Sequence, residues 1–225
     1  MKAAWLGGSG LLFENEKIRI FVDPSFSEKI GGKTRRLPID AKYSGYAPSL
    51  IIVTHAHPES LDLPTLDTLL SHADGAVTIL TSESAYNIIA ERYPEHNPVL
   101  LAPHSVWNEK GVTFYSVKAE HSDRTAIGVI IDDGDKTYYV TGDTLYNFDV
   151  IDDCLDLAPD GVDFVFLPVS GRGGCMNARD AADFAYEIGA GHAVPIAYGT
   201  FDDSRADDFD FDDAIKACPY SEIEL

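Results

Sequence analysis

Residues 49–62 constrain this chain most, because a buried strand there leads directly into a cluster of polar side chains. Residues 50–53 read Leu-Ile-Ile-Val, which is typical of a strand buried on both faces. The next residues are Thr-His-Ala-His, which place His55 and His57 two positions apart. Side chains two apart in an extended chain point to the same side, and paired imidazoles suit a divalent metal. The stretch therefore predicts a sheet with a metal site at the end of a buried strand.

A simpler interpretation of the same stretch remains open. The two histidines would then be solvated loop residues, and Asp62 would only cap a helix that starts at Leu63-Pro64. In the metal interpretation, Asp62 would instead hydrogen-bond to a ligand histidine and orient it. Both roles of Asp62 are compatible with the sequence.

Hydrophobic patterning in the rest of the chain predicts short strands and a few helices. Strands are predicted at residues 3–6, 11–14, 18–22, 50–53, 77–80, 99–102, 112–117, 127–131, 137–140, 162–169 and 193–196. Helices are predicted from 62 or 63 to 72, from 82 to 92 and from 177 to 188. No linker divides the chain, so we predict one domain over residues 1–225. Its class is α/β (α+β), with two sheets packed face to face and helices outside.

Two segments lack a regular pattern. Residues 25–48 contain glycines, prolines and basic residues without periodicity, which predicts a long loop. Residues 202–213 are rich in aspartate, and we interpret them as a solvated acidic loop that leads into a last helix.

The overall charge excludes some classes of partner. The 225 residues include 17 basic and 37 acidic side chains, giving a net charge of −20 that disfavours nucleic acid. A small anionic substrate is still compatible, because a bound cation can dominate the local potential. No apolar run is long enough to cross a membrane. Three scattered cysteines and no signal-peptide pattern predict a cytoplasmic protein.

Further polar motifs follow predicted strands. His121 follows residues 112–117, Asp143 follows residues 137–140, and Arg172 lies in a glycine-rich turn after residues 162–169. If these strand ends meet at one edge of the fold, three imidazoles and a carboxylate converge. This donor set suits zinc, manganese or iron(II).

The order of these motifs resembles the metallo-β-lactamase superfamily. The motifs are Thr-His-x-His at 54–57, Ala-Glu-His-Ser at 119–122 and Thr-Gly-Asp-Thr at 141–144. The later segments Leu-Pro-Val-Ser-Gly-Arg-Gly-Gly-Cys-Met-Asn-Ala and Val-Pro-Ile-Ala-Tyr-Gly-Thr-Phe resemble the branch that includes L-ascorbate-6-phosphate lactonase. The resemblance runs from Leu6 to Phe201 and implies a four-layer αβ/βα sandwich, with the site at the edge where the two sheets meet.

The resemblance also implies a ligand set. His55, His57 and His121 match the ligands of the family's first metal, and Asp143 matches the carboxylate that bridges two metals. Three positions depart from the family pattern: Glu59 replaces an aspartate, whereas Ser60 and Ala197 replace histidines of the second metal. We therefore expect one divalent ion, with zinc first and manganese or iron as alternatives. Glu59, freed from its role as a ligand, would act as general base on the water.

Three more residues are candidates for substrate binding. Arg172 would bind a phosphate or carboxylate group and, as a catalytic residue, would stabilise the charge that develops in the reaction, although a surface arginine explains it equally well. Tyr198 would donate a hydrogen bond to an oxyanion, or would lie at the edge of the core. Asn177 would contact substrate, and it is also a good N-cap for the helix that follows.

Two classes of function follow from this interpretation. The first is a metal-dependent hydrolase that acts on a small ester, lactone or phosphoester through metal-activated water. The alternative is a non-catalytic protein of the same fold that binds a metabolite or a protein partner. A nuclease is disfavoured by the acidic charge, and a homo-oligomer is compatible with the resemblance.

Overall fold

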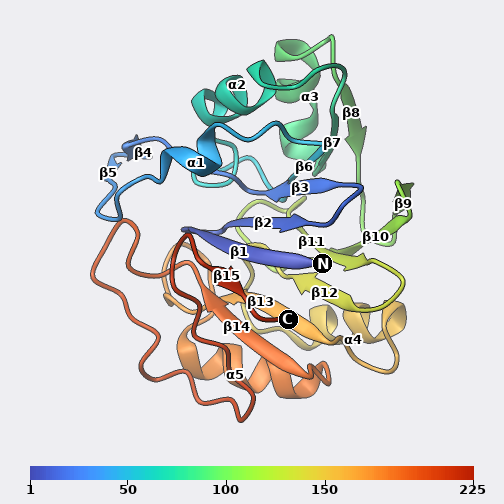
Figure 1. Cartoon of the computed structure of the whole chain (residues 1–225). Coiled ribbons are helices and arrows are strands. Elements are labelled where there is room, and N and C mark those ends of the chain that lie inside the picture. The colour runs from blue at the N-terminus through green and yellow to red at the C-terminus, as the bar shows by residue number, and fades with distance from the viewer.

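Two β-sheets stand face to face between two pairs of helices in the computed structural model, which describes residues 1–225 (Figure 1). The first sheet has the order β15 (Glu222–Ile223), β1 (Lys2–Gly7), β2 (Gly10–Glu14), β3 (Arg19–Val22), β6 (Leu50–Val53), β7 (Thr78–Thr81), β8 (Asn97–Leu100). The second has the order β14 (His192–Ile196), β13 (Phe164–Pro168), β12 (Thr137–Val140), β11 (Ile127–Asp132), β10 (Val112–Lys118), β9 (Val106–Glu109). The short strands β4 (Lys29–Ile30) and β5 (Lys33–Thr34) form a separate hairpin.

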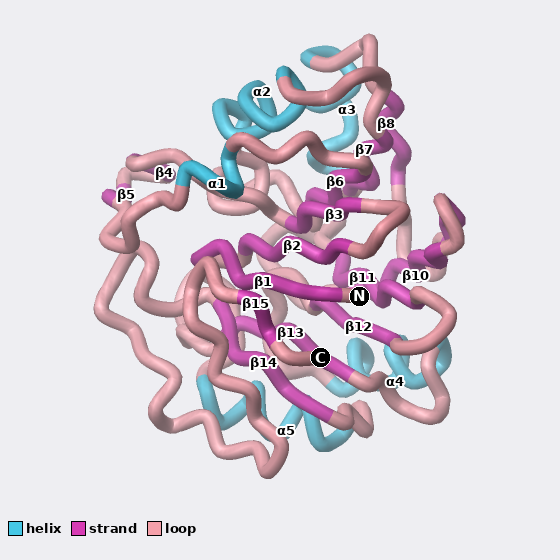
Figure 2. The backbone as a smooth tube through the Cα atoms, in the orientation of Figure 1, coloured by secondary structure: helices cyan, strands magenta, loops and turns pink.

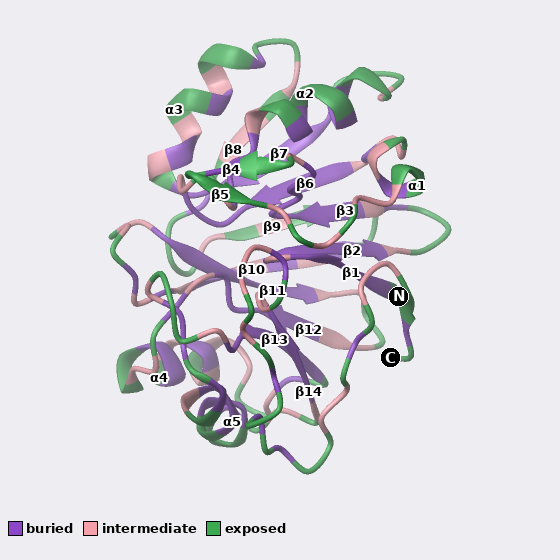
Figure 3. Ribbon diagram, turned by 90° about the vertical axis from the view of Figure 1, so that its left-hand side faces the viewer, coloured by how far each residue is buried: buried purple, intermediate pink, exposed green.

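The helices cover the outer faces of the two sheets. Helices α2 (Leu63–Ser71) and α3 (Glu83–Arg92) lie on the first sheet, and α4 (Phe148–Leu157) and α5 (Ala178–Glu187) lie on the second (Figure 2). The short α1 (Ala41–Ser44) follows the β4–β5 hairpin. The helices bury the faces that contact the sheets and expose the faces that look outward (Figure 3). The four layers confirm the predicted αβ/βα sandwich.

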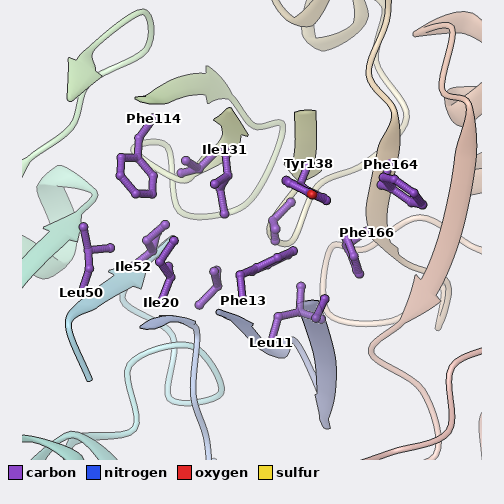
Figure 4. Packing of buried hydrophobic residues seen from close by; sticks show 14 of the residues in the cluster. Leu11, Phe13, Ile20, Leu50, Ile52, Phe114, Ile131, Tyr138, Phe164 and Phe166 are labelled. Carbon is purple, nitrogen blue, oxygen red and sulfur yellow. The ribbon is translucent and has the colours of Figure 1, made fainter. Parts of the chain in front are cut away.

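The largest apolar cluster lies between the sheets (Figure 4). Phe13 of β2 packs edge-to-face on Phe166 of β13, with ring centroids 5.1 Å apart. Alternation along each strand separates this inner layer from the outer ones: Phe13 faces the other sheet, whereas its neighbour Leu12 packs beneath the helices of the first sheet. Each large apolar side chain buried in this way contributes about 1.5–3 kcal/mol.

The strand directions bring the predicted site residues to one edge. Strands β3, β6 and β7 are parallel, as are β12, β13 and β14. Parallel neighbours end at the same edge of a sheet, so the residues that follow β6 and β12 lie where the sheets meet. His55 and Asp143 are among these residues.

Several predicted elements differ in the structure. The prediction of a last helix is wrong. Residues 202–213 are irregular, and the segment after them hydrogen-bonds to one strand of each sheet. Ile215 donates its backbone N–H to Ala193, and Tyr220 donates to Trp5. These sheet contacts, together with Pro219, leave no run of backbone groups for a helix. The strand predicted at 99–102 lies two residues earlier, at β8.

Three features were not predicted. Helix α4 lies in an acidic stretch, and it buries Val150, Ile151 and Cys154 on one face. Strand β9 is a short edge strand with mostly exposed side chains. The long loop at 25–48 contains the β4–β5 hairpin and α1. None of the helices combines the length and apolarity needed to span a membrane.

Candidate metal centre

Three imidazoles converge where the sheets meet. His55 and His57 follow β6, and His121 follows β10. The ring centroids lie 4.9 Å apart for His55–His57, 4.7 Å for His55–His121 and 4.9 Å for His57–His121. One potential ligand nitrogen from each ring lies within 4.8 Å of the other two. The structure therefore brings together three histidines, of which the first and last, His55 and His121, are 66 positions apart in the sequence.

A carboxylate completes this group. Asp143 follows β12, and its Oδ2 lies 3.8 Å from His55 Nε2. Its other oxygen, Oδ1, accepts a hydrogen bond of 3.1 Å from the Ser9 hydroxyl. Ser9 lies in the turn between β1 and β2, so the first sheet holds the carboxylate that the second sheet supplies. Asp143 therefore has one oxygen fixed and one oxygen facing His55.

A buried chain of hydrogen bonds fixes the protonation of His55. Asp23 is 1% exposed and accepts hydrogen bonds from the Thr54 backbone N–H, 2.8 Å, and from its hydroxyl, 2.6 Å. The same hydroxyl oxygen lies 3.0 Å from His55 Nδ1. When Asp23 is ionised, the single hydroxyl proton of Thr54 goes to its carboxylate, and the hydroxyl oxygen then accepts from His55 Nδ1–H. His55 Nε2 then carries a lone pair, the form that binds metal.

The Nε2 atom of His55 is the feature that most strongly indicates a position for a metal ion. It is buried and has no hydrogen-bond partner in the protein. Burial lowers the pKa of His55 to about 4, so the ring is neutral at neutral pH. A buried, unpaired lone pair facing a carboxylate is unfavourable, and a cation between the two would satisfy both. The donor set thus fits a divalent metal.

His121 has protein partners on both ring nitrogens. Its Nδ1 accepts from the Asp123 backbone N–H at 3.2 Å, and its Nε2 lies 3.0 Å from the Gly173 carbonyl oxygen. Gly174 has a φ of +84°, and a Cβ at this position would lie 2.9 Å from His121 Cδ2. The glycine-rich turn therefore lies directly on the ring, and one ring nitrogen must exchange its protein partner to bind an ion.

Asp123 stabilises the loops that carry the histidines. Its carboxylate accepts from Ala56 N at 3.2 Å and from the Ser84 hydroxyl at 2.5 Å, and it also binds Thr125. Burial alone would raise the pKa of Asp123, but these hydrogen bonds lower it well below its usual range. The ionised carboxylate ties the His57 loop to the start of α3.

A cavity of about 300 Å³ opens beside the cluster. His57, Asp143, Glu59, Arg172 and Tyr198 all line it. Two of the predicted ligands, His57 and Asp143, and two of the predicted substrate-binding residues, Arg172 and Tyr198, thus line one space. Every one of these side chains follows a strand or lies in a turn, as expected for a site built on loops of a rigid scaffold.

Two basic side chains in the cavity already have acidic partners. Glu59 Oε1 lies 2.6 Å from Lys33 Nζ. Arg172 pairs with Asp202 at 2.9 Å and with Asp203 at 3.6 Å. The Tyr198 ring packs against Trp5 at a tilt of 35°, with ring centroids 4.8 Å apart, and burial raises the pKa of its hydroxyl.

Two predicted residues have other roles in the structure. The Asn177 side chain accepts from the backbone N–H groups of Arg179 and Asp180, which caps α5, and it does not line the cavity. Asp62 caps α2 and binds the Ser27 and Thr65 hydroxyls rather than a histidine. In both cases the unpaired N–H groups at a helix start explain the residue.

The residue that orients His55 is Asp23, which the sequence analysis did not single out. The signal was present: Asp23 ends a strand, as the histidines do, and the register of β3 with β6 pairs Val22 with Ile52. That register places Asp23 beside Thr54. Asp123 and Lys33 gave no comparable signal, because each lies in a segment without periodicity.

The two positions that depart from the resemblance lie close to the cluster. Ser60 is fully buried, and its hydroxyl oxygen has no hydrogen-bond partner. Ala197 lines the cavity with a φ of +59° and donates its N–H to the Gly8 carbonyl. Neither side chain supplies an imidazole to the cavity.

Comparison with known proteins identifies the family. A family model described as the β-lactamase superfamily domain matches residues 18–198. The chain belongs to the β-lactamase superfamily. Within it, a UPF0173 metal-dependent hydrolase from Pyrobaculum calidifontis is 25% identical over 228 residues, covering 99% of this chain and 95% of the relative.

Solved structures share the fold of this chain. A possible metal-dependent hydrolase from Veillonella parvula gives a TM-score of 0.80 at 13% identity, covering 100% of this chain and 99% of that chain. A metallo-β-lactamase fold protein from Bacillus subtilis gives 0.68 at 19% identity, covering 87% and 85%. At these identities the likeness establishes the metallo-β-lactamase fold.

Proposed function

We propose that the chain is a metal-dependent hydrolase of small esters, lactones or phosphoesters, built as one domain over residues 1–225. The observation that carries the proposal is the buried, unpartnered Nε2 of His55, which faces Asp143 beside two more imidazoles and an open cavity. The superfamily relative named as a metal-dependent hydrolase supports the same function.

His55, His57, His121 and Asp143 would hold one divalent ion, with zinc expected and manganese or iron as alternatives. An ion bound there would lower the pKa of a water molecule to about 7 and polarise the substrate oxygen. Neither Ser60 nor Ala197 offers an imidazole for a second ion. We therefore expect one ion per chain.

Glu59 is the proposed proton acceptor. It lines the cavity together with Asp143 and His57. Burial acts to raise the pKa of Glu59, but the hydrogen bond and positive charge of Lys33, together with a backbone N–H, outweigh it and lower the pKa below the usual range. The carboxylate is thus ionised at neutral pH and able to accept a proton. Tyr198 and Arg172, which also line the cavity, would donate hydrogen bonds to the substrate oxygens.

Metal content and activity together test the proposal. Protein purified without added metal should contain about one divalent ion per chain by elemental analysis. The same sample should hydrolyse at least one member of a panel of lactones, esters and phosphoesters, and chelation should abolish that activity. About two ions per chain would contradict the single-ion site, and metal-free protein would contradict the hydrolase.

Replacing Glu59 with glutamine separates catalysis from metal binding. The amide keeps the size of the side chain but cannot accept the proton, so kcat should fall about 100-fold or more. Metal content should stay at the wild-type value, because the three imidazoles and Asp143 are unchanged. Loss of metal in this variant would show that Glu59 is a ligand rather than a base.

The second candidate is a non-catalytic protein of the same fold. The absence of imidazoles at positions 60 and 197 favours it, because fewer ligands leave a weaker centre. Such a protein would bind metal with a closed set of four ligands and would hydrolyse nothing in the panel. The cavity beside His57 and Asp143 favours the hydrolase, since it leaves space for water and substrate.

A further inference from the structure

We propose that Lys33 is the residue that binds the anionic group of the substrate, a phosphate or carboxylate, by exchanging its partner Glu59 for that group. This inference rests on the proposed function and names the substrate class of the same site. Lys33 lies on β5, in a hairpin far from the histidine motifs in sequence, and its side chain lines the cavity with His57 and Asp143.

The hairpin is held over the cavity by backbone contacts. Arg36, three residues after Lys33, donates its N–H to the Thr200 carbonyl at 2.8 Å. The Arg35 guanidinium lies 5.0 Å from the centre of the Phe201 ring. At the hairpin tip, a Cβ on Gly31 would lie 3.7 Å from Glu59 Oε1. Lys33 is therefore presented to the cavity by a segment that is held against Thr200 and Phe201, which line the same cavity.

The present partner of Lys33 is easily exchanged. The Lys33 and Glu59 side chains are 54% and 26% exposed, although their atoms approach to 2.6 Å. Ion pairs at this exposure contribute little to stability, because water competes for both groups. The ammonium has three donors and Glu59 takes one, so a second acceptor can bind before the first is released.

Charge also favours Lys33 over Arg172 as the anion-binding group. Arg172 already faces two carboxylates, Asp202 and Asp203, whereas Lys33 faces one. Three carboxylates and two cationic side chains line the cavity, so a divalent ion would leave it with an excess of positive charge. In a chain with a net charge of −20, this cavity would then attract a small anion.

Binding of inorganic phosphate and of acetate, measured by calorimetry on the metal-containing protein, tests the inference. Lys33→Met should raise the dissociation constant of at least one of these anions about tenfold, and Lys33→Arg should restore most of the affinity. Lys29→Met is the matched control, because Lys29 is exposed on the same hairpin and does not line the cavity. It should leave both dissociation constants unchanged.

Two results would overturn the inference: equal anion affinities for the wild-type and Lys33→Met proteins, or no anion binding by the wild type. The metal content of each sample is measured in parallel. Wild-type protein without metal would contradict the hydrolase proposal, while the comparison of the Lys33 and Lys29 variants would still decide the anion site.

Discussion

His121→Ala should lower metal affinity more than about 100-fold and abolish hydrolysis, because it removes one of only three imidazoles in the centre. His55, His57 and Asp143 alone would be left to hold the ion. The measurement is competition with a chromogenic chelator, together with hydrolysis of the substrate found in the panel. His72→Ala serves as control, since His72 is exposed at the end of α2.

The variant should also be slightly less stable without metal. Loss of the His121 imidazole leaves the Asp123 N–H and the Gly173 carbonyl without their ring partners. One or two unmade hydrogen bonds cost about 1–3 kcal/mol, which thermal unfolding of the metal-free proteins would detect. A folded His121→Ala protein that keeps wild-type metal affinity would contradict the three-histidine centre.

Asp23→Asn should weaken metal binding about 10- to 100-fold although Asp23 touches no ligand atom. The amide nitrogen would donate to the Thr54 hydroxyl oxygen, and the hydroxyl proton would then turn to His55 Nδ1. His55 would carry its proton on Nε2, the atom that faces Asp143. In the opposite amide orientation, the amide NH2 group would face the Thr54 backbone N–H, which is also a donor. Either arrangement opposes the metal-binding form of His55.

The effect of Asp23→Asn on metal affinity should depend on pH. Burial raises the pKa of Asp23 to about 7, so the wild-type residue loses its proton near neutral pH, whereas asparagine has none to lose. The ratio of wild-type to variant affinity should therefore grow between about pH 6 and about pH 8. Asp62→Asn is the control: it weakens the cap of α2 but has no hydrogen bond to a histidine. A constant ratio would exclude the hydrogen-bond chain.

Local patterns predicted most of the secondary structure. The strand at β6, the caps at Asp62 and Asn177 and the neighbouring strands β11 and β12 all follow from side chains within a few residues of each other. Helix α4 was missed because its acidic sequence hides a short apolar face. The predicted last helix was wrong because contacts with β1 and β14, distant in sequence, take its backbone groups.

The candidate site shows the same division. Residue type and strand-end position were enough to select His55, His57, His121 and Asp143, which the structure brings together. The same signals also selected Asn177 and Asp62, because capping residues and site residues look alike in sequence. Lys33 and Asp123 were overlooked, since nothing within their own segments indicates a site.

By itself the sequence determined which residues have the chemistry to bind a metal and which strands carry them, because both depend on residue type and short-range periodicity. The tertiary structure alone decided that Asp23 orients His55 through Thr54, that Glu59 pairs with Lys33, and that Asn177 lies away from the cavity. These relations depend on the packing of segments far apart in the chain. No local pattern encodes the distance between two such side chains.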